Sequence, residues 1–359
     1  MLNNLSLYNF KNHKEIELEF DFFNLIVGQN GSGKTNILES IYLLLNSHVY
    51  GGLKINRLVN FFGENLFVDG VLDNSDGMTK EFKVTFDSAS SKTSYIYNKT
   101  KVTKPRYIDS LKHTAVFFSP AEINIMYLGP SMRRDFLDEV CMLFDPSFLK
   151  IKSDYSKILR NRNKLLKNIS EGKASKGDLK FRNDAFISKA TSYYIHRKKF
   201  LDFIKERISK IEDILGNKYS LEFEYITKVD FTDIEGSIKS YIEKNIDRDI
   251  IVGHTYIGPH LDDFEFRVQF GKTYYNSSEF LSRGENKSIL IGLKFLEIDF
   301  YLQKHSENIV ILLDDIFSEL DNEHIKAVLD FSKRFQTFIS AQNSPSFLLN
   351  SADIKIINI

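Results

Sequence analysis

The chain lacks three features that mark exported or membrane proteins. Its 359 residues include one cysteine, Cys141, so neither a disulfide framework nor a multi-cysteine metal site is possible. No apolar run reaches about 18 residues, so no membrane span is indicated. Residues 1–8 show no basic segment followed by an apolar core, so we expect no secretion signal and a location in the reducing cytoplasm.

The chain also lacks net charge, because 48 Lys and Arg balance 48 Asp and Glu, but these charges are unevenly spread. Residues 150–210 hold 18 basic and 6 acidic residues, a surplus of +12 that the remainder must offset. A solvated helical face is the ordinary explanation of such a segment, yet this imbalance favours a polyanion such as DNA. The candidate DNA-binding residues are Arg160, Arg162, Lys164, Lys167, Arg197, Lys198 and Lys199.

A glycine-rich run near the N-terminus fits the phosphate-binding P-loop pattern G-x-x-x-x-G-K-[ST]. An apolar strand is predicted at residues 23–27 and a helix after the run, which is the context that the motif needs. We expect Lys34 to reach the β- and γ-phosphates of ATP and Thr35 to hold Mg²⁺; the alternative is an ordinary glycine-rich turn. The predicted nucleotide contacts are Gly28, Gln29, Asn30, Gly31, Ser32, Gly33, Lys34 and Thr35.

A second apolar strand, residues 309–313, ends in two acids, as in the Walker B motif. We expect Asp314 to ligate Mg²⁺ and Asp315 to polarise the attacking water as general base, so that Lys34, Asp314 and Asp315 form the catalytic set. A buried strand that ends in a polar turn would show the same pattern. The P-loop in the same chain favours the nucleotide-binding interpretation.

Leu281-Ser282-Arg283-Gly284-Glu285 precedes that strand and is similar to the L-S-x-G-[QE] signature of ABC ATPases. Taken alone, it is also a serine cap followed by a glycine turn. Residues 318–321 follow Walker B and match the D-loop, so four elements stand in the ABC order. The resemblance implies that ATP closes a head-to-head homodimer, in which Ser282 and Gly284 cap the nucleotide held by Lys34 of the other copy.

The pattern of elements predicts an α/β fold interrupted by helices. Strand-like alternation fills most of the first 120 residues, helical sequence runs from about residue 122 to residue 215, and strands and helices alternate afterwards. We therefore expect an ABC-type P-loop ATPase head, with a mixed sheet and helices, that is interrupted by a basic helical arm. The expected parts are residues 1–120 with the P-loop, 121–215 with the arm, and 216–359 with the signature, Walker B and D-loop.

Over its whole length the chain resembles the RecF family of bacterial recombination mediator ATPases, relatives of SMC proteins. The resemblance rests on the motifs above and on four segments: residues 7–12, 118–120, 129–138 and 258–263. It implies ATP-dependent binding to double-stranded and gapped DNA, a weak DNA-dependent ATPase, and work with RecO and RecR to load RecA in replication, repair and the SOS response. It also implies that Lys11 and Asn12 contact the nucleotide.

Some positions depart from the family pattern or leave alternatives open. Glu285 stands where Gln is more common, Lys11 stands where we expect Arg, and residues 340–342 supply no transporter-type histidine switch. His260 either contacts nucleotide or DNA or supports the Gly-Pro turn before it. Of two adjacent arginines, Arg133 and Arg134, we expect one to bind phosphate or DNA and the other to pair with Asp138.

Two other classes of protein are less consistent with the sequence. An OLD-type ATPase-nuclease needs a separate acidic nuclease domain, whereas the helical insertion is basic and about 38 residues follow Asp321. A transporter-associated ATPase is disfavoured by the long basic segment between the P-loop and the signature, and by the missing histidine switch.

Overall fold

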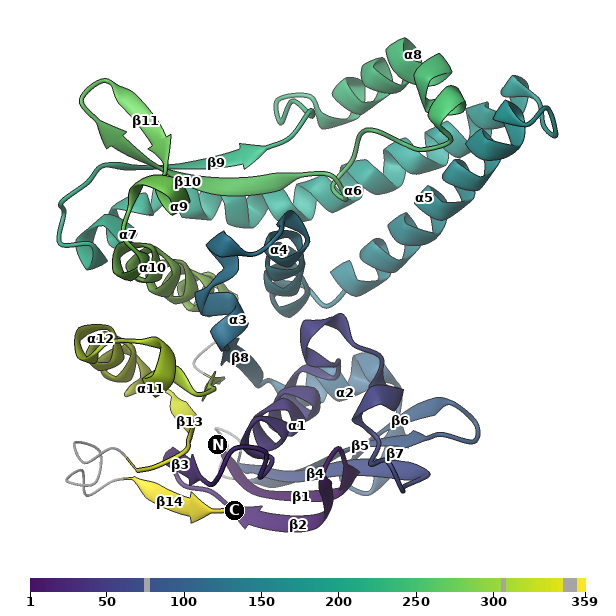
Figure 1. Cartoon of the computed structure of the whole chain (residues 1–359). Coiled ribbons are helices and arrows are strands. Elements are labelled where there is room, and N and C mark those ends of the chain that lie inside the picture. The colour runs from purple at the N-terminus through teal and green to yellow at the C-terminus, as the bar shows by residue number, and fades with distance from the viewer. Residues whose placement is uncertain (74–77, 305–307, 345–353) are drawn as a thin grey trace. The chain divides into compact units, whose positions relative to one another are not determined.

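The computed structural model of the chain describes residues 1–73, 78–304, 308–344 and 354–359 (Figure 1). These residues form two compact units: Met1–Asn124 with Tyr301–Ile359, and Ile125–Phe300. The predicted boundary at residue 215 is therefore wrong, because residues 216–300, which include the signature, fold with the helical arm. Local alternation of strands and helices cannot reveal this, because β9 (Leu221–Ile226), β10 (Asp263–Phe270) and β11 (Thr273–Asn276) form a sheet of their own in the second unit.

A five-stranded parallel sheet forms the centre of the first unit, in the order β14-β3-β13-β12-β8. Strands β8 and β12 are almost entirely apolar, as parallel strands covered on both faces usually are, and every residue of β12 and β13 is buried. Because the strands run in one direction, the segments after β3, β12 and β13 meet at one edge. The bounds are β3 (Phe23–Val27), β8 (Thr114–Phe118), β12 (Ile309–Leu313), β13 (Gln336–Ala341) and β14 (Lys355–Asn358).

A six-stranded antiparallel sheet, in the order β2-β1-β4-β5-β6-β7, completes the sheets of this unit. Buried and less buried residues alternate along β4 and most of β5, so one face of the sheet lies on the core. The bounds are β1 (Leu2–Phe10), β2 (His13–Glu19), β4 (Asn65–Asp73), β5 (Thr79–Asp87), β6 (Lys92–Tyr97) and β7 (Thr100–Val102).

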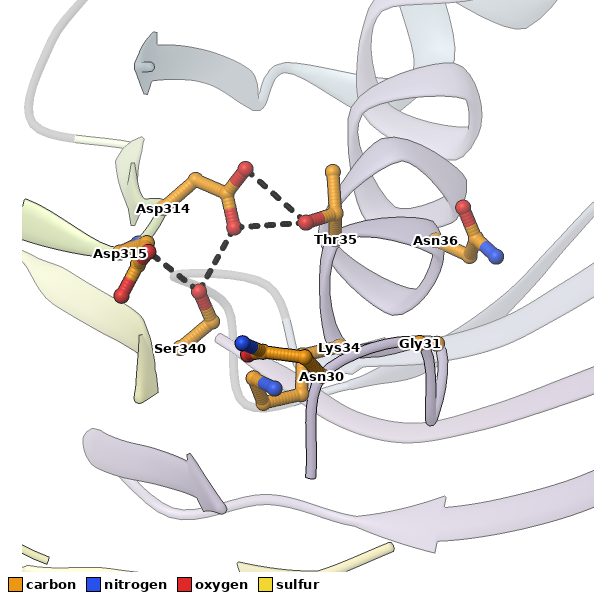
Figure 2. A pocket seen from close by; sticks show the side chains of 9 residues that line it. Asn30, Gly31, Lys34, Thr35, Asn36, Asp314, Asp315 and Ser340 are labelled. Carbon is orange, nitrogen blue, oxygen red and sulfur yellow. Dashed lines mark hydrogen bonds between the residues drawn. The ribbon is translucent and has the colours of Figure 1, made fainter. Parts of the chain in front are cut away.

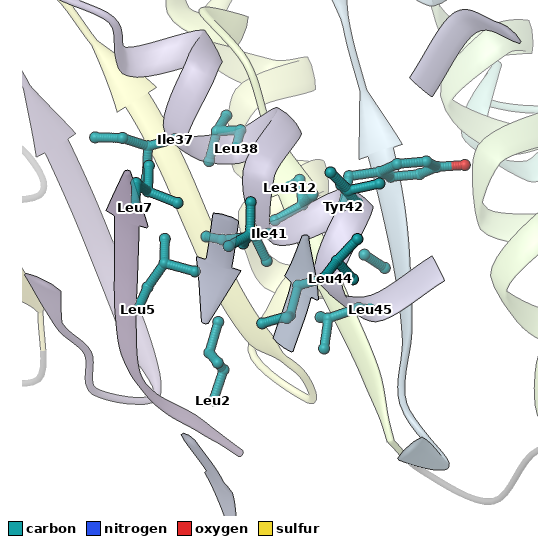
Figure 3. Close-up of a cluster of buried hydrophobic side chains, with 14 of the residues drawn as sticks. Leu2, Leu5, Leu7, Ile37, Leu38, Ile41, Tyr42, Leu44, Leu45 and Leu312 are labelled. Atoms are coloured by element: carbon teal, nitrogen blue, oxygen red, sulfur yellow. The ribbon is translucent and has the colours of Figure 1, made fainter. Parts of the chain in front are cut away.

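Helix α1 (Lys34–Asn46) packs between the two sheets and carries the P-loop at its N-terminus. Its apolar face, with Ile37, Ile41 and Leu44, meets leucines of β1 and Leu312 of β12 in one buried cluster (Figure 3). The helix lies so close to β4 that a Cβ atom on Gly70 would stand 2.3 Å from a methyl group of Leu44. This packing fixes the P-loop against the strand that ends in the Walker B acids.

The remaining helices of the first unit are short. They are α2 (Lys104–Leu111), α3 (Pro120–Ile123), α11 (Ile316–Glu319) and α12 (Asn322–Ser332). Asp321, in the predicted D-loop, caps α12 by accepting hydrogen bonds from the amides of Glu323 and His324.

The second unit consists of long helices and a three-stranded antiparallel sheet, β11-β10-β9. Helices α5 and α6 lie side by side and α8 packs on both, around a core that includes Phe148, Phe186 and Ile242 (Figure 1). The helices are α4 (Pro130–Phe144), α5 (Phe148–Ser170), α6 (Leu179–Glu206), α7 (Ile208–Ile214), α8 (Ile234–Val252), α9 (Ser277–Phe280) and α10 (Arg283–Leu302). The strands are β9 (Leu221–Ile226), β10 (Asp263–Phe270) and β11 (Thr273–Asn276).

Among the described residues, no helix is both long and apolar enough to cross a membrane, and no group of three or more His, Cys, Asp or Glu side chains is placed to hold a metal ion.

Candidate functional site

The P-loop bends between β3 and α1 in a way that needs its glycines. Gly31 and Gly33 have φ angles of 85° and 108°, in the left-handed region that residues with a Cβ atom rarely adopt. Lys34 curls back over the loop, and its ammonium donates to the carbonyls of Gly28 at 2.7 Å and Gln29 at 2.9 Å. The backbone amides at the start of α1 add positive potential, so the loop has the features of a phosphate site.

The turn between β1 and β2 supports the P-loop from outside. The Asn12 amide donates to the carbonyls of Gly31 and Ser32, at 3.3 and 2.9 Å, and accepts from Asn36 at 2.6 Å. His13 Nε2 lies 3.1 Å from the carbonyl of Gly33. The predicted contact residue Asn12 thus bonds directly to the backbone of the P-loop. Sequence reasoning missed His13, whose one signal is its place next to Asn12 at the hairpin turn.

Lys11, the other predicted contact in this turn, forms an ion pair with Glu39 of α1. Its φ angle of 49° places it in the left-handed region, where the turn reverses direction. The pair ties the hairpin to the helix that begins at the P-loop.

Asp314 and Asp315 lie beside the P-loop, as the Walker B interpretation predicts. The Asp314 carboxylate accepts from the Thr35 hydroxyl, at 2.9 and 3.0 Å to its two oxygens, and from the Ser340 hydroxyl at 2.6 Å. Ser340 in turn accepts from the amide of Asp315 at 2.9 Å (Figure 2). Sequence reasoning gave Ser340 no role; its signal is the end of β13, which pairs with β12 in parallel.

The electrostatics of Asp314 follow from its burial. Desolvation raises the pKa of this carboxyl, the neighbouring charge of Asp315 adds to the rise, and the hydrogen bonds from Ser340 and Thr35 oppose it. A cation beside the carboxylate offsets the cost of keeping it ionised.

The P-loop and the two acids enclose a cavity of about 270 Å³ (Figure 2). Its polar groups include the Lys34 ammonium, the Thr35 hydroxyl and the two carboxylates. A hydroxyl and a carboxylate at this spacing are the oxygen ligands that Mg²⁺ prefers, so the donor set fits that ion. The lining residues are Asn30, Gly31, Gly33, Lys34, Thr35, Asn36, Asp314, Asp315 and Ser340.

The signature segment begins α10 in the second unit. Ser282 and Glu285 form a reciprocal cap: the Ser282 amide and hydroxyl donate to the Glu285 carboxylate at 2.9 and 2.7 Å, and the Glu285 amide donates to the Ser282 hydroxyl at 3.2 Å. Tyr219 donates to the other Glu285 oxygen at 2.9 Å. Asn286 is buried and ties the helix start to the carbonyls of Ser277, Leu281 and Ser282. The Glu285 side chain therefore caps the N-terminus of α10 together with Ser282.

Two of the seven predicted DNA contacts are buried, which contradicts their assignment. Arg162 is fully buried and pairs with Asp249 at 3.0 Å, while its other nitrogens donate to Asn183 and Thr255. A charge at helical spacing looks the same in sequence whether it faces water or the core. Arg162 holds α5 against α6 and α8 and cannot reach DNA.

Arg197 is the second correction. It is buried, pairs with Asp138 at 2.7 Å, and donates to the Tyr225 hydroxyl and the carbonyl of Pro259. Burial acts to raise the pKa of Asp138, but Arg197 and then Lys152 outweigh it and hold this pKa below its ordinary value. Arg197 thus joins α4, α6 and the Gly-Pro turn as a structural group.

The other five predicted contacts keep access to water. Arg160, Lys164, Lys167 and Lys199 are exposed, and Lys198 is half-buried beside Asp202 at 2.5 Å. The first three stand three to four residues apart on α5, so they share one face of that helix.

Three further residues from the segments that carry the family resemblance, His260, Arg133 and Arg134, have partners within the second unit. His260 Nδ1 lies 2.6 Å from the Tyr155 hydroxyl, and burial lowers the pKa of His260 to about 4, which agrees with a structural role for the histidine. Arg133 pairs with Asp263 at 2.6 Å, so the expected pair with Asp138 is wrong. Arg134 donates to the backbone carbonyl of Asp262 at 3.0 Å.

The family model for the RecF/RecN/SMC N-terminal domain matches residues 1–357, and the chain belongs to this family. It is 32% identical to the DNA replication and repair protein RecF of Thermoanaerobacter pseudethanolicus, over 98% of this chain and 96% of the relative. It is 30% identical to the protein of that name from Ruminiclostridium cellulolyticum, over 97% and 94%. The predicted family is confirmed.

Solved structures agree with this assignment. A structure described as the recombination mediator protein RecF-ATP in the RecFOR pathway superposes with a TM-score of 0.84 and 29% identity, over 96% of this chain and 92% of the other. An SMC head bound to the C-terminal winged-helix domain of ScpA matches at a TM-score of 0.52 and 17% identity, which shows a shared fold. The predicted ABC-type ATPase head is thereby confirmed.

Proposed function

We propose that this chain is an ATPase that binds double-stranded and gapped DNA in DNA replication and repair. The observation that carries the proposal is one cavity in which the P-loop meets Asp314 and Asp315. The chain belongs to a family in which relatives of nearly the same length bear the name DNA replication and repair protein RecF. A solved relative is described with ATP, which fits the same cavity chemistry.

In the proposed reaction, the P-loop binds the triphosphate of ATP and Lys34 exchanges two carbonyl partners for phosphate oxygens. Thr35 and Asp314 would hold Mg²⁺, which supplies positive charge to the phosphates when it is bound. Asp315 acts as general base and orients the attacking water. Ser340 donates to the Asp314 carboxylate and accepts from the backbone amide of Asp315, and so holds both residues at the end of β12.

A single head lacks one side of the proposed site. Ser282 and Gly284, at the start of α10, would cap the nucleotide held by a second copy, so ATP binding drives a head-to-head homodimer. Hydrolysis is slow in this scheme because it awaits assembly of both copies, and it times the release of the dimer. Ser282→Arg should block ATP-driven dimers and leave ATP binding intact, as measured by size exclusion and calorimetry.

The exposed cations of the arm are the proposed contacts to the DNA backbone, and Arg162 and Arg197 are not among them. Because a solved relative is described in the RecFOR pathway, we infer that RecR, with RecO, is the partner in loading RecA. This role in recombinational repair and the SOS response implies a cytoplasmic location.

The test is ATP turnover by the purified chain with no DNA, single strands, duplex and gapped duplex. We expect slow turnover that duplex or gapped DNA stimulates, and a Lys34→Ala control that shows none. Slow turnover indifferent to every DNA would leave an ABC-type ATPase and remove the DNA role, and a protein regulator would then be the better hypothesis.

A further inference from the structure

Two adjacent phenylalanines in the first unit stand almost wholly in water. Phe61 is 93% exposed and Phe62 is 87% exposed, and their rings meet edge to face with centroids 5.3 Å apart. They follow the bridge between Phe10 and Val59 and precede β4. Single exposed apolar residues are common, but two adjacent rings left in water are the kind of patch that binds something.

The backbone presents these rings instead of letting them fold inward. Asn60 is buried; its amide donates to the carbonyl of Lys11 and its side-chain oxygen accepts from the amide of Phe62 at 3.0 Å. The backbone adds bonds from Asn60 to Asn9 at 2.8 Å and from Gly63 to Asn60 at 2.9 Å. The loop is therefore fixed on both sides of the rings.

The exposed charges that precede the rings along the chain are positive, and an exposed acid, Glu64, follows Phe62 by two residues. No acidic residue occurs between Glu39 and Glu64, whereas Lys54 and Arg57 are exposed just before the rings. Aromatic rings stack on unpaired bases, and neighbouring cations bind the phosphates between those bases. An apolar pocket of a partner protein would bury the rings but would provide no anionic partner for the two cations.

The same turn that holds this loop also holds the P-loop. The carbonyl and amide of Lys11 bond to Asn60 and Leu58, and the next residue, Asn12, bonds to Gly31 and Ser32. The loop that carries the rings is thus connected to the phosphate-binding loop through Lys11 and Asn12, and both loops lie in the same compact unit.

We propose that Phe61 and Phe62 form a stacking platform for unpaired DNA bases, with Lys54 and Arg57 on the adjoining phosphates. The proposal rests on the DNA-binding function proposed above and makes it more specific. The exposed cations of the arm contribute affinity for any duplex, whereas the platform adds affinity where a strand is unpaired.

The experiment compares two double variants of the full chain, Phe61→Ala with Phe62→Ala, and Phe61→Tyr with Phe62→Tyr. Affinity is measured at one salt concentration, with ATP, for a blunt duplex and for a gapped duplex of equal length with 2-aminopurine in the gap. Because both side chains are exposed, neither variant should unfold, and ATP affinity serves as the check.

We expect the alanine variant to bind the gapped duplex at least about tenfold more weakly, to lose the quenching of 2-aminopurine, and to bind the blunt duplex within about twofold of wild type. The tyrosine variant, which keeps the rings, should retain both signals. Equal affinity of the alanine variant for gapped DNA would overturn the platform and leave duplex binding in place. A wild-type chain that binds no DNA would overturn the proposed function as well. Loss of dimerisation or of a protein partner, with gapped-DNA affinity unchanged, would reassign the rings to that interface.

Discussion

Buried cations of the P-loop and of the helical arm differ in the kind of partner that they have. In the P-loop, Lys34 is buried and the hydrogen bonds described for its ammonium go to two backbone carbonyls. In the arm, Arg162 and Arg197 are buried and each faces a buried carboxylate, Asp249 or Asp138. A carbonyl offers a partial charge, so Lys34 keeps attraction for an anion. A carboxylate neutralises the charge of the arginine, so the arginine keeps little attraction for a further anion.

This comparison shows why counting charges along the sequence led to two wrong DNA-contact predictions in the arm. The surplus over residues 150–210 counts every basic residue equally, but two of the predicted contacts are neutralised inside the unit. The acids that neutralise them, at positions 138 and 249, lie outside the counted segment. Only the fold brings them together, so the surplus overstated the charge available to a polyanion.

The largest expected effect is on the arginine side. Arg162→Met leaves Asp249 buried beside the gap and should lower the free energy of unfolding by about 3–5 kcal/mol, measured by urea denaturation. The double variant Arg162→Met with Asp249→Leu removes both charges and should recover most of that loss. Exposed Arg160, changed to Met, serves as the control and should shift stability by less than about 0.5 kcal/mol. A single variant as stable as the wild type would remove the contrast with Lys34.

The corresponding change in the P-loop should act on binding. Lys34→Ala removes a charged phosphate contact and should weaken ATP binding by about 1.5–3 kcal/mol, measured by calorimetry. It should change the free energy of unfolding by less than about 1 kcal/mol, because it leaves no buried charge unpaired. Lys14→Ala, on exposed β2, is the matched control for ATP affinity. Loss of stability comparable to that of Arg162→Met would mean that Lys34 is mainly structural.

Most elements of the first unit could be predicted from the sequence because their patterns are local. The predicted strands 23–27 and 309–313 coincide with β3 and β12, since a short, largely apolar run bounded by turn residues is typical of a buried strand. The sequence also predicts a turn at residues 73–77, of which residues 74–77 lie outside the described residues. Helix α8 was not predicted, although isoleucines recur every four residues along it, from Ile234 to Ile250, which is the helical pattern. The P-loop and Walker B acids were found, whereas Ser340 and His13 required the strand order and the hairpin.

A half-buried acid offers a third test, through pH. Burial raises the pKa of Glu139 to about 8 from 4.5; Glu297 adds to the rise, while Lys152 and Lys294 oppose it. The folded protein thus keeps a proton that the unfolded chain releases, so the stabilising contribution is complete below about pH 4.5 and is lost as pH rises through about 8. Glu139→Gln should match the wild type near pH 4 and exceed its stability by a few kcal/mol at pH 8.5, since each unit of pKa shift corresponds to about 1.4 kcal/mol. Parallel stability curves for the two proteins would contradict this.

The smallest change in stability is expected on the exposed face of α5. Unlike the buried arginines, cations on this face are expected to affect DNA binding and not stability. Arg160 and Lys164 have side chains in water, so Arg160→Ala and Lys164→Ala should each alter stability by less than about 0.5 kcal/mol.

If they contact DNA phosphates, each substitution should reduce the slope of log affinity against log salt by about 0.9, because one fewer counterion is released per lost contact. Lys101→Ala, exposed on β7 of the first unit and outside the arm, is the control. Unchanged slopes would mean that the surviving cations are a solvated face. The charge surplus of the arm would then have structural roles at its buried positions and none in DNA binding at its exposed ones.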